Sequence, residues 1–480
     1  MESGAVSFTT VVLIIDWSIR LVMVPVLVWR PQRPTVALAW IAVITFMPWM
    51  GLVAYFLFGE ARLGNRRRRR YARDVHPKVT ANRPGVHRAY VIRPNIQEHQ
   101  QAVVQVAETL VGMPILGGNQ IELLPNAARY IDLIINDIEN ARNHVHLLFF
   151  IFEPDDVGRR VGEALAAATA RGVQCRLLAD AAGSFGFFQG YADELRSRGV
   201  HVQANLPVSP LRRTLARLDL RNHRKLAVID GMVAYTGSHN IIRGDYGDRR
   251  AGSWQDLTAR IRGPAVTQLQ AVFYEDWHFE TGVGLPEKDM FPEPGTPDQV
   301  PIQVVPSGPN LPHSVVRDIV IEALHSARRR VIITTPYLVP DEALLTALRL
   351  VAARGARVDI VMPRKSDKML CDLAGRSYFA ELLRAGVHLH LNRAGLLHAK
   401  TMTVDDGFAM LGSANFDIRS FFLNFELGLL FYEPGATAQL RFCQTQYIND
   451  SDEVGLETWD QRPTVHRLAQ NLSMLLSPLL

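Results

Sequence analysis

Residues 222–240 read NHRKLAVIDGMVAYTGSHN, and residues 398–415 read HAKTMTVDDGFAMLGSAN. Both stretches match one pattern, H-x-K-x4-D-x6-G-S-x-N. A pattern of this length that occurs twice in one chain indicates two paired structural units. The fixed positions are His223, Lys225, Asp230, Gly237, Ser238 and Asn240 in the first copy, and His398, Lys400, Asp405, Gly412, Ser413 and Asn415 in the second.

Each copy has the sequence of a β-hairpin. Apolar and partly β-branched residues precede an Asp-Gly pair, which favours a strand followed by a tight turn. Side chains two residues apart on a strand lie on the same face. We therefore expect His223 beside Lys225 in the first copy, and His398 beside Lys400 in the second.

These residue types suit an anionic phosphodiester. The ammonium groups of Lys225 and Lys400 can neutralise its charge. A neutral imidazole can attack phosphorus and form a covalent intermediate. A second imidazole, in its protonated form, can donate a proton to the leaving alkoxide, so that two histidines meet the chemical need without a metal. The expected neutral donors to the phosphate are Asn240 and Asn415, supported by Ser238 and Ser413.

Acidic residues follow both motifs. Asp256 lies 33 residues after the first histidine and Glu426 lies 28 residues after the second. A carboxylate that binds one ring nitrogen orients a histidine and sets its tautomer, so we expect these two acids to support the histidines. Asp230 and Asp405 belong to the fixed catalytic pattern, but their place at a hairpin end favours a structural role.

The predicted elements repeat before each motif in the order helix, strand, helix, strand. This alternation predicts βαβ units and a mostly parallel sheet in an α/β fold of two α/β/α halves, residues 119–281 and 302–480. Five prolines mark residues 282–301 as a linker. The predicted elements are 130–141, 144–152, 157–171 and 173–178 in the first half, and 315–327, 331–335, 342–354 and 358–362 in the second.

Two apolar stretches open the chain, at residues 8–29 and 35–58, and each is long enough to span a bilayer. Asp16 and Arg20 interrupt the first stretch at a spacing that lets them pair on one helix face. Pro48 is expected to kink the second stretch. Residues 1–60 are therefore predicted to form a membrane anchor of two transmembrane helices.

A basic connector, residues 61–118, follows the anchor and contains five consecutive arginines at 66–70. Basic residues flank membrane helices on the cytoplasmic side, so we expect the rest of the chain in the cytoplasm. The same cluster can bind anionic headgroups. A net charge of +5 also suits nucleic acid, but the position of the arginines beside a membrane span argues against that partner.

Other segments leave alternatives open. The aromatic loop at 184–188 can either dip into a membrane or cap the core, and the apolar segment 468–480 can pack on the domain or touch the bilayer. The chain has three scattered cysteines without metal-like spacing, which we expect to be reduced.

Taken together, these features resemble those of the bacterial cardiolipin synthases of the phospholipase D superfamily. The resemblance rests on the paired motif, the two apolar stretches, GSANFDIRS at 412–420, LNFE at 423–426 and LSPLL at 476–480. It implies two phospholipase D-like halves that share one active site across a pseudo-two-fold axis. It also implies a multi-pass protein of the bacterial inner (cytoplasmic) membrane. His239 departs from the usual family pattern after Ser238.

The resemblance implies transphosphatidylation without a metal or cofactor. His223, the nucleophile by the usual family assignment, would take the phosphatidyl group from phosphatidylglycerol and release glycerol. A second phosphatidylglycerol would then attack the intermediate to give cardiolipin. One alternative is a membrane-bound phospholipase D, which uses water and yields phosphatidate. A phosphodiesterase-type nuclease would keep the motifs but needs no membrane anchor, and a scaffold without activity would have lost a motif residue.

Overall fold

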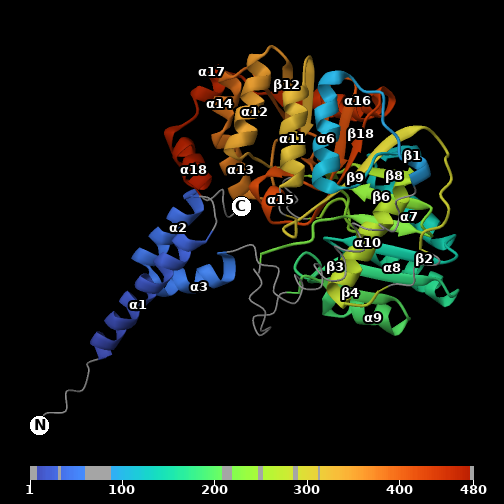
Figure 1. Cartoon of the computed structure of the whole chain (residues 1–480), viewed down its shortest axis with the longest axis horizontal. Helices are drawn as coiled ribbons and strands as arrows, with labels where there is room; N and C mark the ends of the chain where they lie inside the picture. Colours follow the sequence, from blue (N-terminus) through green and yellow to red (C-terminus); the bar gives the residue numbers. More distant parts are fainter. Residues whose placement is uncertain are drawn as a thin grey trace, which may run out of the picture. The chain divides into compact units, whose positions relative to one another are not determined.

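The computed structural model describes residues 8–30, 34–59, 88–207, 219–246, 252–284, 290–311 and 314–475 (Figure 1). The arginine cluster and the last five residues, about which the sequence made predictions, lie outside these ranges. The chain divides into a smaller unit, residues 1–69 with 209–220, and a larger unit, residues 70–208 with 221–480. Each unit is described by itself.

The smaller unit contains three apolar helices, α1 (Phe8–Trp29), α2 (Pro34–Phe46) and α3 (Pro48–Phe58). Among the described residues, α1 is the one helix long and apolar enough to cross a membrane. The predicted second span is divided into two short helices, because Met47 leaves helical geometry at φ −136° and ψ 66°. The predicted break at Pro48 is confirmed: proline cannot donate within a helix and suits the first position of α3.

Helix α3 turns back towards the start of α2. A Cβ atom on Gly51 would lie 3.0 Å from the Ile44 Cα, so glycine permits this close approach. The rings of Trp40 and Tyr55 are 5.3 Å apart, and Arg30 Nη1 donates to the Tyr55 hydroxyl over 3.1 Å. The second apolar stretch therefore forms a helical hairpin whose two ends approach each other.

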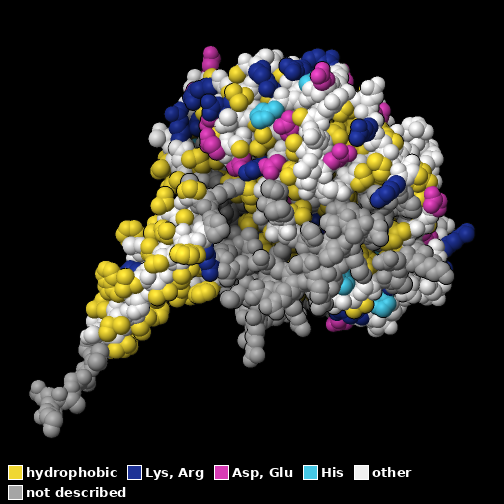
Figure 2. All heavy atoms as spheres, viewed as in Figure 1, with side chains coloured by type: hydrophobic (Ala, Val, Ile, Leu, Met, Phe, Trp, Pro, Cys, Tyr) yellow, Lys and Arg dark blue, Asp and Glu magenta, His cyan; other side chains and the backbone are white. Residues whose placement is uncertain are grey.

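The predicted ion pair on α1 is confirmed, since Arg20 Nη1 lies 2.9 Å from Asp16 Oδ2. Arg20 also donates to the carbonyl of Thr45 on α2. Apolar side chains cover the outside of the three helices, as the yellow surface in Figure 2 shows. Exposed examples are Leu13, Ile14, Trp17, Leu21, Val28, Leu38, Phe46, Trp49, Val53 and Phe56.

The larger unit is built on one 15-stranded sheet in the order β19-β13-β12-β10-β15-β16-β18-β9-β1-β8-β6-β5-β2-β3-β4. Outward from the β1–β9 junction, β8-β6-β5-β2-β3-β4 of the first half correspond in order to β18-β16-β15-β10-β12-β13 of the second half. Strand β19 is an additional strand at one edge. This arrangement agrees with the two predicted halves. The strands of the first half are β1 (Leu116–Leu124), β2 (His144–Phe149), β3 (Gln174–Asp180), β4 (His201–Asn205), β5 (Leu226–Ile229), β6 (Val233–Gly237) and β8 (Thr258–Arg262). Those of the second half are β9 (Val300–Ser307), β10 (Arg330–Thr334), β12 (Arg357–Pro363), β13 (His388–Asn392), β15 (Thr401–Val404), β16 (Phe408–Gly412), β18 (Glu426–Phe431) and β19 (Ser451–Glu453).

Helices cover this sheet in both halves (Figure 1). Helix α6 (Gln101–Val111), from the range predicted as a connector, packs on α11 and β9. The other helices of the first half are α7 (Ala127–Glu139), α8 (Asp156–Ala170), α9 (Tyr191–Ser197) and α10 (Ala265–Thr281). Those of the second half are α11 (Val315–Ser326), α12 (Glu342–Ala353), α13 (Met369–Ser377), α14 (Phe379–Arg384), α15 (Ile418–Phe422), α16 (Pro434–Asn449), α17 (Leu456–Asp460) and α18 (Thr464–Leu475).

The prediction of a mostly parallel sheet was wrong. Parallel pairing is limited to β2-β3-β4 and β10-β12-β13 within the large sheet, and its other neighbours pair antiparallel. The cause is the pair of motif hairpins, β5-β6 and β15-β16, whose strands are joined by short turns that allow only antiparallel pairing. The hairpins themselves are as predicted.

Of the two roles predicted for the aromatic loop after β3, the structure confirms packing in the core. Phe187 is buried and packs on Phe152 at a ring distance of 4.8 Å, whereas Phe185 is exposed. Most of the loop therefore completes the core of the first half, and one aromatic side chain remains outside.

Candidate active site

The two motifs meet because each is joined to the other half through its backbone. The His223 amide donates to the Phe425 carbonyl over 2.9 Å, and the His398 amide donates to the Gln255 carbonyl over 2.8 Å. The short strands β7 (Trp254–Gln255) and β14 (Leu396–Leu397) pair in parallel beside the second of these contacts. Each histidine is therefore placed next to the segment that carries the acid of the opposite half.

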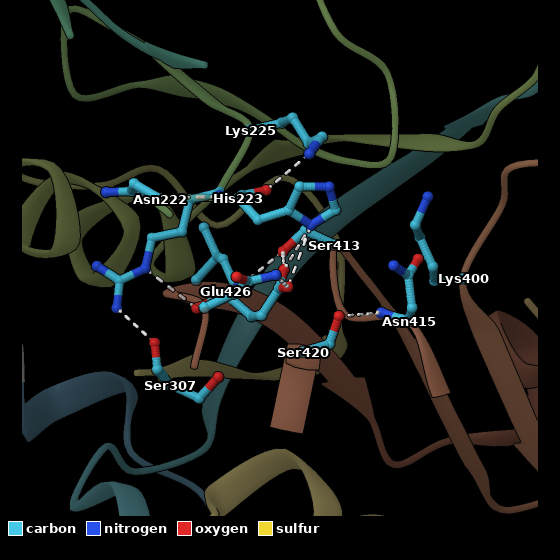
Figure 3. Close-up of polar contacts among 12 residues, drawn as sticks. Asn222, His223, Lys225, Ser307, Lys400, Ser413, Asn415, Ser420 and Glu426 are labelled. Atoms are coloured by element: carbon cyan, nitrogen blue, oxygen red, sulfur yellow. Dashed lines mark hydrogen bonds and ion pairs between the residues drawn. The ribbon is translucent and has the colours of Figure 1, made fainter. Parts of the chain in front are cut away.

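The acid–histidine pairs are crossed between the halves. Nδ1 of His223 lies 3.1 and 3.0 Å from the two carboxylate oxygens of Glu426 (Figure 3). Nδ1 of His398 lies 2.6 Å from Oδ1 of Asp256. The structure thus brings both predicted acids to the predicted histidines, each from the other half of the chain.

The two lysines lie beside their histidines as the motif spacing predicts. Lys225 Nζ donates to the His223 carbonyl over 2.7 Å, and Lys400 Nζ donates to the His398 carbonyl over 2.5 Å. Both ammonium groups are buried. Burial lowers the pKa of Lys225 to about 7 and the pKa of Lys400 well below its usual value, so an anionic ligand would favour the charged form of both amines.

Burial also controls the histidines. It lowers the pKa of His223 to about 4 and that of His398 to about 3, and the adjacent lysines act in the same direction. Burial alone would raise the pKa of Glu426, but the contacts with His223 and Lys225 lower it to about 2. An ionised carboxylate can only accept, so Nδ1 of each neutral ring carries the proton. The Nε2 lone pair of each ring is then available for chemistry.

The predicted serines and asparagines play different parts. Ser413 Oγ donates to Glu426 Oε2 over 2.5 Å and accepts from the Leu427 amide, so it holds the acid that holds His223. Ser238 accepts instead from the amide of Leu257, the neighbour of Asp256. The amide side chains of Asn240 and Asn415 are buried, and the first accepts from the Ile151 amide through Oδ1.

Asp230 and Asp405 do not reach the histidines. Asp230 accepts from the backbone amides of residues 142–144 at 2.8–2.9 Å, and Asp405 accepts from those of residues 328–330 at the same distances. Five residues of extended chain place each aspartate about 16 Å from its motif lysine. These contacts agree with the structural role that the hairpin position favours, in which each aspartate clamps the start of a central strand.

The motif itself contains a residue that sequence reasoning missed. Arg224 is buried, and its Nε donates to the Glu426 carbonyl over 3.0 Å. Its Nη2 donates to the Ser307 carbonyl, and its Nη1 lies 2.7 Å from Asp276. The sequence signal for this role was the charged residue itself, which lies between the motif positions His223 and Lys225. Arg224 joins both halves directly behind the His223–Glu426 pair.

Aromatic rings border both histidines. The Trp254 ring lies 4.4 Å from the His398 ring, and the Phe150 ring lies 5.0 Å from the His223 ring. His239, the departure from the family pattern, is buried, stacks on Tyr130 at 4.7 Å and contacts Thr258 through Nδ1. The Trp254 and Phe150 rings each cover one of the two motif imidazoles.

Known proteins resemble this chain in sequence and in fold. A family model described as "Cardiolipin synthase, PLD-like domain" matches residues 134–277 and 320–442, and one described as "Phospholipase_D-nuclease N-terminal" matches residues 10–60. The proteins named "Cardiolipin synthase A" from Yersinia pseudotuberculosis serotype O:1b (strain IP 31758) and Yersinia pestis bv. Antiqua (strain Angola) are each 38% identical over 456 residues, which cover 92% of this chain and 93% of theirs. The crystal structure of phosphatidylserine synthase from Haemophilus influenzae Rd KW20 has a similar fold, with a TM-score of 0.62 and 16% identity over 80% of this chain and 100% of that one.

Proposed function

Because the chain belongs to the cardiolipin synthase family of the phospholipase D superfamily, we propose that it is a phosphatidyltransferase that makes cardiolipin. Its substrates are two molecules of phosphatidylglycerol, and its products are cardiolipin and glycerol. The observation that carries the proposal is the crossed pairing of His223 with Glu426 and of His398 with Asp256. This pairing supplies two imidazoles with free Nε2 atoms to one phosphate site.

In the first step, Nε2 of His223 attacks phosphorus and the bond from phosphorus to the glycerol oxygen breaks. The leaving oxygen takes a proton from Nε2 of protonated His398. Burial favours neutral His398, and the arriving anionic phosphodiester favours its protonated form. Lys225 and Lys400 neutralise the phosphate charge, and glycerol leaves as the first product.

In the second step, the terminal hydroxyl of another phosphatidylglycerol attacks the phosphatidyl-histidine. Neutral His398 accepts the hydroxyl proton, the bond between His223 and phosphorus breaks, and cardiolipin is released. Asp256 stabilises the imidazolium that forms and holds the ring in place. The low exposure of both histidine side chains, 11% and 5%, limits the access of bulk water to the intermediate.

The anchor suits an enzyme whose donor and acceptor are both held in a bilayer. We propose that α1 crosses the bacterial inner membrane and that the α2–α3 hairpin enters the membrane and returns to the same side. This arrangement leaves Arg30 and the arginines at 66–70 on one side, which the positive-inside rule assigns to the cytoplasm. The catalytic unit then also lies in the cytoplasm, and a second complete span is the alternative.

The test is a product analysis. The purified full-length protein is given labelled phosphatidylglycerol as the sole lipid, and the lipid and water-soluble products are separated. Cardiolipin together with released glycerol is the expected result. Phosphatidate with glycerol would show that water is the acceptor and would replace the synthase with a hydrolase. Chains carrying His223→Ala or His398→Ala are the controls, and each is expected to abolish turnover.

A further inference from the structure

Helix α18 presents an apolar stripe to solvent and turns two polar side chains towards the protein. Val465, Leu468, Leu472 and Leu475 lie at the spacing of one helix stripe, and they are 55–74% exposed. The inward face carries Gln470, which is 4% exposed and accepts from Arg462, and Ser473, which is 5% exposed. A helix on a water-facing surface has the opposite polarity, so this stripe requires an apolar partner.

The stripe continues towards the active site through α13, which packs against α18. Met369 and Leu370, at the start of α13, are also exposed. They lie two and three residues after Asp367, which accepts from the Tyr337 hydroxyl over 2.5 Å and acts electrostatically on Lys400. The exposed apolar side chains therefore extend from α18 to the surroundings of the catalytic lysine.

We propose that α18 and the start of α13 form a membrane-docking surface that lies on the bilayer holding the lipid substrates. The inference rests on the proposed function, because lipid substrates must leave a bilayer to reach His223 and His398. Lys368, Arg384 and Arg467 near the stripe are exposed, and the first two lie 3.8 and 3.0 Å from the acids Asp367 and Asp460. Such solvent-facing cations can exchange these partners for the anionic headgroups of a bilayer. Figure 2 shows dark blue and yellow side chains together over the region of α17 and α18.

This surface differs from the membrane anchor in what it does. The anchor confines the enzyme to the membrane, whereas α18 and α13 belong to the catalytic unit and present it to the lipid surface in one orientation. An amphipathic helix binds such an interface by burying its apolar face to the depth of the headgroup–acyl boundary. The side chains that face the protein, Gln470 and Ser473, remain hydrogen-bonding groups away from lipid.

The position of α18 is tested with a fluorescent label on the full-length protein in phosphatidylglycerol-containing vesicles. The label is placed at Leu472→Cys in a chain that also carries Cys371→Ala and Cys443→Ala. The matched control has the label at Phe442→Cys, an exposed apolar position on α16. Brominated lipids are expected to quench the Leu472 label several-fold more than the Phe442 label, and aqueous iodide is expected to show the reverse order.

Two results would overturn the proposal. Equal quenching of both labels by iodide would place the stripe in water, and shielding of the Leu472 label from both quenchers would place it against protein. The label reports position without catalysis, so a failure of the proposed activity would be recognised separately.

A kinetic test uses the double variant Leu468→Ser, Leu472→Ser. With phosphatidylglycerol in vesicles, kcat/KM is expected to fall about tenfold because the interface loses two apolar anchors. With a short-chain, monomeric phosphatidylglycerol, turnover is expected to stay within about twofold of the parent protein, since neither leucine belongs to the site. The matched control is Phe442→Ser. An equal loss on both substrates, or a loss on neither, would contradict the docking surface.

Discussion

The imidazole of His223 is held by the carboxylate of Glu426, 203 residues further along the chain, with Nδ1 and Oε2 3.0 Å apart. The reciprocal pair, His398 and Asp256, is 142 residues apart and closes over 2.6 Å. Each half of the chain thus supplies a histidine to the site and an acid to the histidine of the other half. The active site consequently exists only when both halves are folded against each other.

Glu426→Gln is expected to lower turnover by at least about 100-fold, because the neutral amide no longer fixes the tautomer of His223 or stabilises its charge. The measurement is the rate of cardiolipin formation with phosphatidylglycerol. Asp359→Asn is the matched control, since Asp359 also binds a buried histidine, His390, over 2.9 Å but belongs to the β12–β13 pair outside the site. A similar loss of turnover in the two variants would contradict a specific role for Glu426.

Asp230→Ala is expected to act on stability rather than on chemistry. Its carboxylate accepts from three backbone amides at 2.8–2.9 Å, so its removal leaves donors unsatisfied and costs about 2–4 kcal/mol. The midpoint of thermal unfolding should fall, while the turnover of the protein that remains folded changes by less than about tenfold. Asp405→Ala should behave in the same way. If Asp230→Ala lost as much turnover as His223→Ala at an unchanged unfolding midpoint, Asp230 would have a catalytic role instead.

The motif hairpins and the placement of each lysine beside its histidine were predictable from the sequence because their determinants are local. The spacing of His223 and Lys225 follows from the alternation of an extended chain, and an Asp-Gly pair marks each turn. The role of Asp230 was ambiguous, since a motif position can serve either the substrate or the fold. Its backbone partners, residues 142–144, lie more than 80 positions away and carry no sequence signal.

The crossed pairing and the sheet topology were beyond sequence reasoning. Asp256 follows the first motif and Glu426 the second, and only the antiparallel junction of β1 with β9 brings each acid to the opposite histidine. The alternation of helices and strands suggested a parallel sheet, but the hairpins made most neighbours antiparallel. The hydropathy of residues 35–58 likewise suggested one span, although Pro48 divides it.

The buried histidines are expected to make the protein less stable as the pH falls from about 6.5 to 4.5. The pKa of His223 is about 4 in the folded protein, below the value of about 6.5 expected in the unfolded chain. The unfolded chain therefore binds more protons than the folded protein in this window, so the free energy of unfolding falls as the pH falls below 6.5. The decrease is up to about 1.4 kcal/mol per pH unit for each such histidine.

This pH dependence is checked by thermal unfolding in detergent at several pH values, followed by tryptophan fluorescence. His223→Asn removes one titrating group, so the fall in the unfolding midpoint between pH 6.5 and 4.5 should be smaller than in the parent protein. His201→Asn is the matched control, because His201 is exposed. If His223→Asn and His201→Asn gave the same pH dependence, burial of a neutral His223 would be contradicted.

The topology of the anchor makes a separate prediction. If α1 crosses the membrane and the α2–α3 hairpin returns to its side of entry, the N-terminus and the catalytic unit lie on opposite sides. A cysteine introduced by Ser3→Cys should then react with a membrane-impermeant maleimide that is added to intact spheroplasts. A cysteine introduced by His201→Cys in the catalytic unit should react only after lysis. Protection of both positions until lysis would instead support two complete spans.

The measurement that tests the central claim most directly is the capture of the phosphatidyl group on the enzyme. His398→Asn removes the group that protonates the leaving glycerol and activates the acceptor, so both steps slow and the second has no general base. After incubation with phosphatidylglycerol, mass spectrometry of alkaline digests should find the acid-labile phosphoramidate on His223, and none in His223→Asn. A phosphoramidate on His398 in His223→Asn, with none on His223 in the reverse variant, would contradict the assigned nucleophile.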